Sequence, residues 1–95
     1  MIEFEWDARK NRSNFEKHGI HFEEACLIFE GRVLTWADER TDYREVRLVS
    51  IGMIAPVMAV VVVHTDRNGN LRIISARLAN RRERTLYEEH FRSAP

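Results

Sequence analysis

The sequence lacks the residues for disulfides and zinc sites, and it lacks the apolar segments that span or target membranes. It contains one cysteine, Cys26, which excludes an internal disulfide. No cysteines and histidines have the spacing of a zinc site, so we expect neither a metal nor a cofactor. The longest apolar run, residues 53–63, is too short to cross a bilayer. The first residues are acidic where a signal peptide would be basic. These absences predict a reduced, cytoplasmic protein with no membrane partner.

Net charge is also absent, but the charges are unevenly distributed. The 15 Lys and Arg residues balance 15 Asp and Glu residues, and 44% of the chain is apolar, which predicts a single domain over residues 1–95. Residues 20–45 carry seven acids and three bases, whereas residues 67–84 carry six bases and one acid. All six bases are arginines, whose side chains bind phosphate oxygens through two hydrogen bonds. We therefore expect a phosphate-binding surface within residues 67–84.

The N-terminal residues predict a strand followed by a helix. Residues 2–6 alternate apolar and acidic side chains, the pattern of a strand with one buried face. Asp7 is a suitable N-cap for a helix over residues 8–18. Gly19 can end this helix in a left-handed conformation.

Apolar residues with helical spacing predict a second, short helix that ends at Gly31. They are Phe22, Ala25, Cys26 and Phe29. Residues 33–36 predict a strand, and residues 38–42 predict a polar, exposed and mobile loop.

The second half of the chain predicts three strands and a helix. Residues 44–53 alternate, whereas residues 57–63 are all apolar and so predict a central strand that is covered on both faces. Asn68-Gly69 predicts a hairpin turn, which leads into an antiparallel strand over residues 71–78.

Asn80 is a suitable N-cap for the last helix, and Glu83 completes a variant capping box. The expected order is β-α-α-β-β-β-β-α. It indicates an α+β fold in which two N-terminal helices and one C-terminal helix pack against an antiparallel sheet of about four to five strands.

Two groups of residues resemble the BrnT family of bacterial type II toxins. The first group is Trp6-Asp7, Lys10, Asn14, Lys17-His18-Gly19 and Phe22-Glu23-Glu24-Ala25, and the second is Arg72-Ile73-Ile74-Ser75-Ala76-Arg77, Glu83-Arg84 and Tyr87. The resemblance implies a fold similar to RelE and a ribonuclease activity that arrests translation. It also implies neutralisation by a BrnA antitoxin with a ribbon-helix-helix DNA-binding domain. The hetero-oligomer of toxin and antitoxin would then bind operator DNA through the antitoxin and repress its operon.

Metal-independent RNA cleavage by 2'-hydroxyl attack needs a base, an acid and cations that stabilise the pentacoordinate phosphate. Arg77, at the end of a predicted strand, is our main candidate for such a cation, although a salt bridge to Glu83 or to a helix acid would also explain it. Arg84 belongs to the same motif and is the second candidate. Either Glu83 or a histidine would then move the protons.

His18 and His64 are the candidate histidines, because an imidazole titrates near neutral pH. His18 could equally satisfy the free carbonyls at a helix end. His64 stands at the exit of the all-apolar strand.

Six further residues are candidates for RNA binding: Lys10, Lys17, Arg72, Arg81, Arg82 and Tyr87. Solvation also explains the two lysines, Arg81 and Arg82, and core packing also explains Tyr87. Because side chains alternate along a strand, Arg72 should lie on the opposite face to Arg77 and need not share its site. The alternative to RNA binding is an Arg72 that is solvated or faces the antitoxin.

Two functions from different classes remain open. The first is a toxin ribonuclease that acts on RNA, either free or on the ribosome. The alternative is a non-catalytic binding module, which acts with its antitoxin in operon repression and leaves RNA intact.

Overall fold

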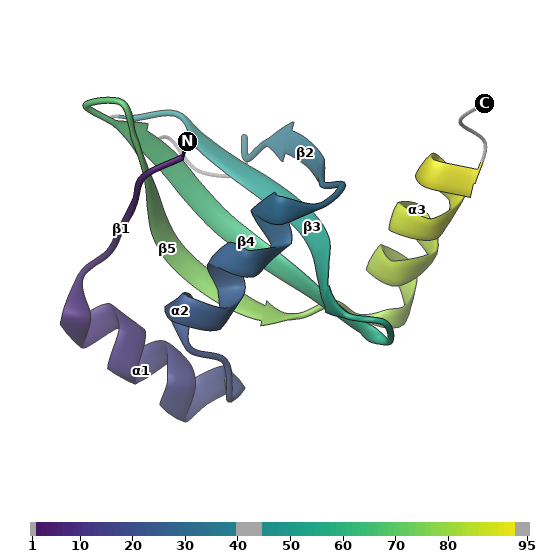
Figure 1. Cartoon of the computed structure of the whole chain (residues 1–95), viewed down its shortest axis with the longest axis horizontal. Coiled ribbons are helices and arrows are strands. Elements are labelled where there is room, and N and C mark those ends of the chain that lie inside the picture. Colours follow the sequence, from purple (N-terminus) through teal and green to yellow (C-terminus); the bar gives the residue numbers. More distant parts are fainter. Residues whose placement is uncertain (1, 40–44, 93–95) are drawn as a thin grey trace.

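The structure is a computed structural model that describes residues 2–39 and 45–92, and it confirms the expected α+β order (Figure 1). The elements are β1 (Phe4–Glu5), α1 (Ala8–His18), α2 (Phe22–Ala25), the 3-10 helix η1 (Cys26–Glu30), β2 (Leu34–Ala37), β3 (Arg47–Ala55), β4 (Met58–Arg67), β5 (Asn70–Leu78) and α3 (Arg81–Arg92). The strand order β1-β5-β4-β3-β2 puts the all-apolar run at the centre of the sheet, as expected. Most of the predicted loop, residues 40–42, lies outside the described residues.

The sheet is mixed, whereas the sequence predicted an antiparallel one. β1 pairs in parallel with β5, with Phe4 opposite Leu71, and the other three strand pairs are antiparallel. A tight hairpin forces two strands to be antiparallel, but β1 and β5 are separated by most of the chain. The alternation of residues 2–6 indicates a strand and carries no information about its direction.

The predicted caps of α1 are confirmed. The carboxylate of Asp7 accepts hydrogen bonds from the backbone N–H of Arg9 at 2.8 Å and of Lys10 at 3.2 Å. At the other end, Gly19 has a φ of 74°, and its N–H donates to the Phe15 carbonyl at 2.8 Å. His18, in the last turn, is therefore held at a defined helix end.

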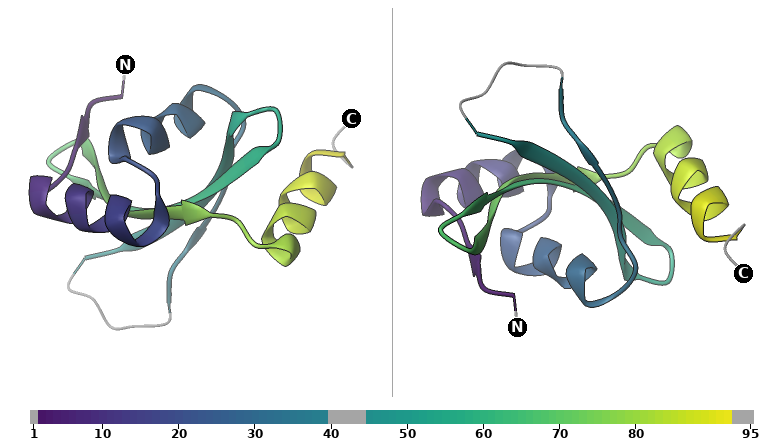
Figure 2. Two further views of the ribbon diagram at one scale, coloured as in Figure 1. Left: turned by 90° about the horizontal axis from the view of Figure 1, so that it is seen from below. Right: turned by 90° about the horizontal axis from the view of Figure 1, so that it is seen from above.

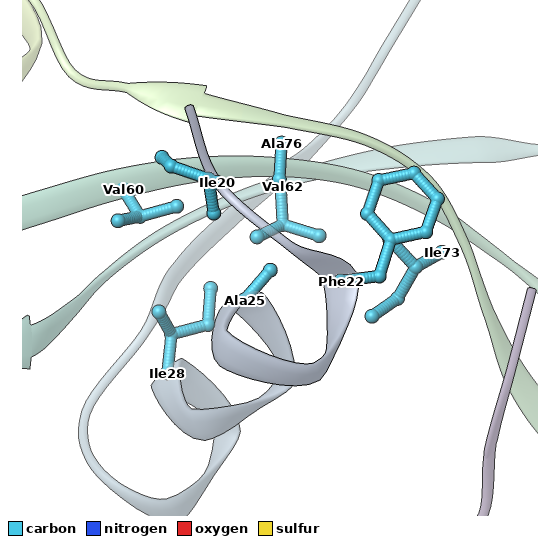
Figure 3. Packing of buried hydrophobic residues seen from close by; sticks show 8 residues of the cluster. All are labelled: Ile20, Phe22, Ala25, Ile28, Val60, Val62, Ile73 and Ala76. Carbon is cyan, nitrogen blue, oxygen red and sulfur yellow. The ribbon is translucent and has the colours of Figure 1, made fainter. Parts of the chain in front are cut away.

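The second predicted helix changes from α2 to a 3-10 helix after Ala25, which changes the residues that it buries. Three residues per turn place Phe22, Ala25 and Ile28 on one side, and these three are fully buried. Cys26 and Phe29, expected in the apolar stripe, are only partly buried. Figure 3 shows the buried side chains against those of β4 and β5, on what we call the α2 face of the sheet: Val60, Val62, Ile73 and Ala76.

The opposite side of the sheet, the α3 face, has a smaller core of Val49, Ile51 and Val61. Tyr87 of α3 packs against this core, but α3 has no buried residue. It stands apart from α1 and α2, beyond the end of β5 (Figure 2). α3 therefore packs on this face through few residues, although Val49, Ile51 and Val61 of the sheet are themselves buried.

A β-bulge interrupts β5. Val63 pairs with Ser75 while the next residue of β4, His64, pairs with Ile73. Ile74 is left without a partner, so side chains on either side of it no longer follow simple alternation.

Candidate active site

A pocket of about 440 Å³ opens on the α3 face. Its floor consists of Val49, Val61 and Val63. The residues around this floor come from four elements: His18 of α1; Trp36, Ala37, Asp38 and Glu39 at the end of β2; Ser75, Ala76 and Arg77 of β5; and Glu83 of α3. The pocket thus brings together three of the predicted catalytic residues, Arg77, Glu83 and His18.

Arg77 and Glu83 form a bidentate ion pair in this pocket. The guanidinium Nη1 and Nη2 donate to Glu83 Oε1 and Oε2, both at 2.8 Å. These hydrogen bonds are the main cause that holds the pKa of Glu83 below its usual value, with a further contribution from the Asn80 N–H. Glu83 is therefore ionised at neutral pH, and the salt bridge considered from the sequence is present.

The first turn of α3 fixes Glu83 in place. The Asn80 side chain accepts a hydrogen bond from the Glu83 N–H at 2.8 Å, and Glu83 Oε1 accepts one from the Asn80 N–H at 2.9 Å. This is the predicted capping box. One carboxylate thus both caps α3 and binds Arg77.

Asn14 connects α1 to β5 beside the pocket. Its amide accepts a hydrogen bond from the Ala76 N–H at 3.0 Å, donates to the Ala76 carbonyl at 2.8 Å, and also donates to the Ile20 carbonyl at 3.0 Å. β1 pairs with β5 only at Leu71 and Arg72. Further along β5, the buried Asn14 side chain takes the place of a neighbouring strand and forms hydrogen bonds with the β5 backbone. It holds the end of α1, and hence His18, against the strand that carries Arg77.

His64 lies away from the pocket, on the α2 face. It is only 5% exposed, and its Nε2 is 2.8 Å from the hydroxyl of Ser50, which lies 2.7 Å from that of Thr35. The ring meets Phe29 edge-on at 5.1 Å. Burial lowers the pKa of His64 to about 4. The structure therefore does not bring this histidine together with Arg77.

The arginines of α3 lie outside the pocket. Arg81 and Arg84 line a separate hollow with Thr85 and Glu88. Arg82 lines another hollow, beside Trp36 and others.

Arg72 lies on the same face as Arg77, which contradicts the prediction from strand alternation. Leu71 and Ala76, five positions apart, both pack on the α2 face, so the residues that follow each of them both face away from it. The bulge at Ile74 is the reason. Arg72 is nevertheless absent from the pocket and forms a salt bridge of 2.7 Å with Glu5.

The remaining RNA-binding candidates do not line the pocket either. Lys10 and Lys17 are exposed on α1. The Tyr87 hydroxyl donates to the Arg32 carbonyl at 3.0 Å, and its ring tilts against Phe91 at 4.8 Å. Core packing, one of the two alternatives for Tyr87, is thus observed.

Trp36 and Ser75 also line the pocket, although neither is a site candidate from the sequence. An aromatic residue at a strand end, next to a polar loop, was the available signal for Trp36. Within residues 2–39 and 45–92, no three His, Cys, Asp or Glu side chains are placed to hold a metal ion.

Comparison with known proteins establishes the family. The family described as "Ribonuclease toxin, BrnT, of type II toxin-antitoxin system" matches residues 6–83, a span that includes His18, Arg77 and Glu83. The chain belongs to this family. Membership in the BrnT family makes it a relative of ribonuclease toxins that function with an antitoxin.

A solved structure shares the BrnT fold. The crystal structure of the Brucella abortus ribonuclease toxin, BrnT, superposes with a TM-score of 0.63 and 23% identity, covering 85% of this chain and 100% of that chain. No curated protein matches the chain significantly. In the part of the chain that the structure describes, no helix is long and apolar enough to cross a membrane.

Proposed function

We propose that this chain is a ribonuclease toxin that cleaves RNA without a metal and so arrests translation in the cytoplasm. One observation supports the proposal above all others: Arg77, Glu83 and His18 line one pocket. Cleavage by 2'-hydroxyl attack needs a cation for the phosphate, a base for the nucleophile and an acid for the leaving group. The pocket contains one residue of each kind.

Each residue has a role that follows from its chemistry. Glu83, ionised at neutral pH, takes the proton of the 2'-hydroxyl, whose oxygen attacks the adjacent phosphorus. Arg77 donates to the non-bridging oxygens and stabilises the charge of the pentacoordinate phosphate. Protonated His18 gives its proton to the departing 5'-oxygen. The products are a 2',3'-cyclic phosphate and a 5'-hydroxyl, and proton exchange with water restores Glu83 and His18.

The ion pair between Arg77 and Glu83 links substrate binding to the activation of the base. A phosphate that binds Arg77 competes for the donors that now hold the Glu83 carboxylate. Loss of these hydrogen bonds raises the pKa of Glu83 and makes it a better base when the 2'-hydroxyl arrives. The pair that neutralises Arg77 in the free protein thereby gives way to the catalytic arrangement.

Family membership implies an antitoxin as the partner. We propose a BrnA-type antitoxin with a ribbon-helix-helix domain, which neutralises the toxin in a hetero-oligomer and contacts operator DNA. The RNA substrate is either free or held on the ribosome.

A specific observation favours the alternative, a non-catalytic binding module. Glu83 occupies both terminal nitrogens of Arg77, and Asp38 and Glu39 add negative charge to the same pocket. A phosphate must therefore compete with one carboxylate for Arg77 and approach two others.

The two functions are separated by growth arrest on expression without antitoxin, combined with cleavage of naked RNA by the purified protein. The proteins to compare are wild type, Arg77→Ala and Arg77→Lys, with Arg12→Ala on the exposed side of α1 as a matched control. We expect arrest and cutting for wild type and the control, and a loss of about 10²- to 10³-fold in cutting for Arg77→Ala. Arrest without cutting points to ribosome dependence. If wild type causes no growth arrest and cuts no RNA, the result supports the binding module.

A further inference from the structure

Trp36 forms the wall of the pocket opposite β5. It pairs with Val49, which pairs with Val63, which in turn pairs with Ser75. Residues opposite each other in neighbouring strands lie on the same face, so Trp36 and Ser75 stand on either side of a floor of valines. The strand spacing places their Cα atoms roughly 14 Å apart. A phosphate at Arg77 and a base against Trp36 would therefore lie on opposite walls of one trough.

The Trp36 side chain remains accessible although it is large and apolar. It is 38% exposed at the edge strand of the sheet, and Leu86 of α3, beyond it, is 50% exposed. An exposed aromatic face beside a pocket marks a binding surface more often than an isolated apolar residue does. Because π-faces are common to all four bases, an indole is a stacking platform for RNA of any sequence.

The pocket continues past Trp36 into a second hollow, which shares Trp36 and Glu83 with it. Arg82 and Asn80 line this hollow, which places a second cation beside Trp36 but outside the pocket of Arg77. Asp38 and Glu39 line the first pocket only, and Glu89 lines the second hollow only. The second hollow therefore has one acid fewer than the first, so a polyanion in the trough leaves on the side of Arg82.

We propose that Trp36 stacks on the base of the nucleotide whose phosphate binds Arg77, and that Arg82 contacts the next phosphate. This inference rests on the proposed function, and it specifies the substrate as unpaired RNA. In a duplex both faces of each base are covered by stacked neighbours, so a paired nucleotide cannot use this platform. A protein segment is the other class of occupant, but the arginines at both ends of the path favour a polyanion.

Fluorescence of Trp36 offers a direct test. The chain has two tryptophans, so a Trp6→Phe background leaves Trp36 as the only indole. The probe is a short single-stranded RNA with 2'-methoxy groups in place of the 2'-hydroxyls, which prevents cleavage by 2'-attack. We expect this probe to quench the fluorescence of Trp36, and the same RNA in a duplex to leave it unchanged.

Substitutions at position 36 measure the contribution of stacking. We expect Trp36→Ala to weaken binding of the probe by about tenfold or more, and Trp36→Phe to stay within about threefold of wild type. Val57→Ala is the matched control, since Val57 is an apolar side chain that is 78% exposed in the turn between β3 and β4. If Trp36→Ala does not fold, the quenching of Trp36 fluorescence and the probe affinity of Trp36→Phe test the stacking instead.

Three results would overturn the inference, and they have different meanings. If Trp36→Ala binds the probe and cuts natural RNA as wild type does, the subsite is wrong while the proposed function stands. If wild type neither binds nor cuts RNA, the proposed function fails and the subsite fails with it. If Trp36→Ala weakens only the binding of the antitoxin, the hollow belongs to a protein partner.

Discussion

Arg77 at the end of β5 and Glu83 in the first turn of α3 are joined by two parallel hydrogen bonds of 2.8 Å. The same carboxylate accepts a hydrogen bond from the Asn80 N–H, so it also closes the capping box of α3. One side chain thereby connects a strand, a helix and the pocket between them. We expect substitutions at this pair to affect both stability and activity, so experiments on them have to measure both.

Glu83→Gln separates the proposed base from the structural role of this side chain. Glutamine keeps an oxygen for the capping box but cannot take a proton, so we expect RNA cleavage to fall by about 10²- to 10⁴-fold. Arg77 is 43% exposed, and solvent screening limits the loss of unfolding free energy to about 1 kcal/mol. Single-turnover cleavage and urea unfolding measure the two effects. Glu16→Gln, on the exposed side of α1, is the control. Cutting by Glu83→Gln at the wild-type rate would exclude Glu83 as the base.

The parts of the fold that local sequence controls could be predicted. Asp7 caps α1 and Gly19 ends it, because each acts on backbone groups within a few residues. Asn68 and Gly69 have φ values of 54° and 84°, as the turn between β4 and β5 requires. The bulge at Ile74 depends on how β5 pairs with β4, so the period of the sequence alone does not reveal it.

The candidate site was predictable to a similar extent. Arg77 and Glu83 lie in one arginine-rich segment, and their salt bridge was foreseen as an alternative. The sequence leaves both His18 and His64 as candidates, with only His18 inside the motif; the packing of α1 and the burial of His64 on the other face separate them. Trp36 reaches the pocket through strand pairing, which no local pattern specifies.

Asn14→Ala should lower the free energy of unfolding by more than the loss of a polar side chain usually does. The asparagine makes three hydrogen bonds to the backbone of Ala76 and Ile20 and is only 7% exposed, so its removal leaves buried N–H and C=O groups without partners. We expect the free energy of unfolding to fall by about 2–4 kcal/mol, measured by urea titration. Ser13→Ala, at the exposed neighbouring position, should change it by less than about 0.5 kcal/mol. Equal unfolding midpoints for the two variants would show that water replaces the amide at no cost.

His64 should make stability depend on pH. Its folded-state pKa of about 4 lies below the unfolded value of 6.5, so between these values the unfolded chain binds more protons. The free energy of unfolding therefore falls as the pH falls through this window, by about 1 kcal/mol per pH unit. Urea titrations at pH 7, 6 and 5 measure the slope.

His64→Gln removes this titration and should flatten the slope between pH 7 and 5, whatever its effect on absolute stability. His18→Gln, at an exposed histidine, should leave the dependence in place. A slope that persists in His64→Gln would assign it to other groups.

Gly52 of β3 should not tolerate even a methyl group, because η1 crosses the strand at this point. A Cβ atom at Gly52 would lie 2.6 Å from the Ile28 Cβ and 3.2 Å from the Val33 Cγ1. The Ile28 Cβ is next to the backbone and cannot turn away, so Gly52→Ala has to push η1 off the sheet. We expect a loss of about 1–3 kcal/mol in the free energy of unfolding, measured by urea titration.

Gly31→Ala is the matched control, since its Cβ would meet no atom within 4 Å, and it should stay within about 0.5 kcal/mol of wild type. If Gly52→Ala proved as stable as Gly31→Ala, η1 would have room to move and would not be closely packed on β3.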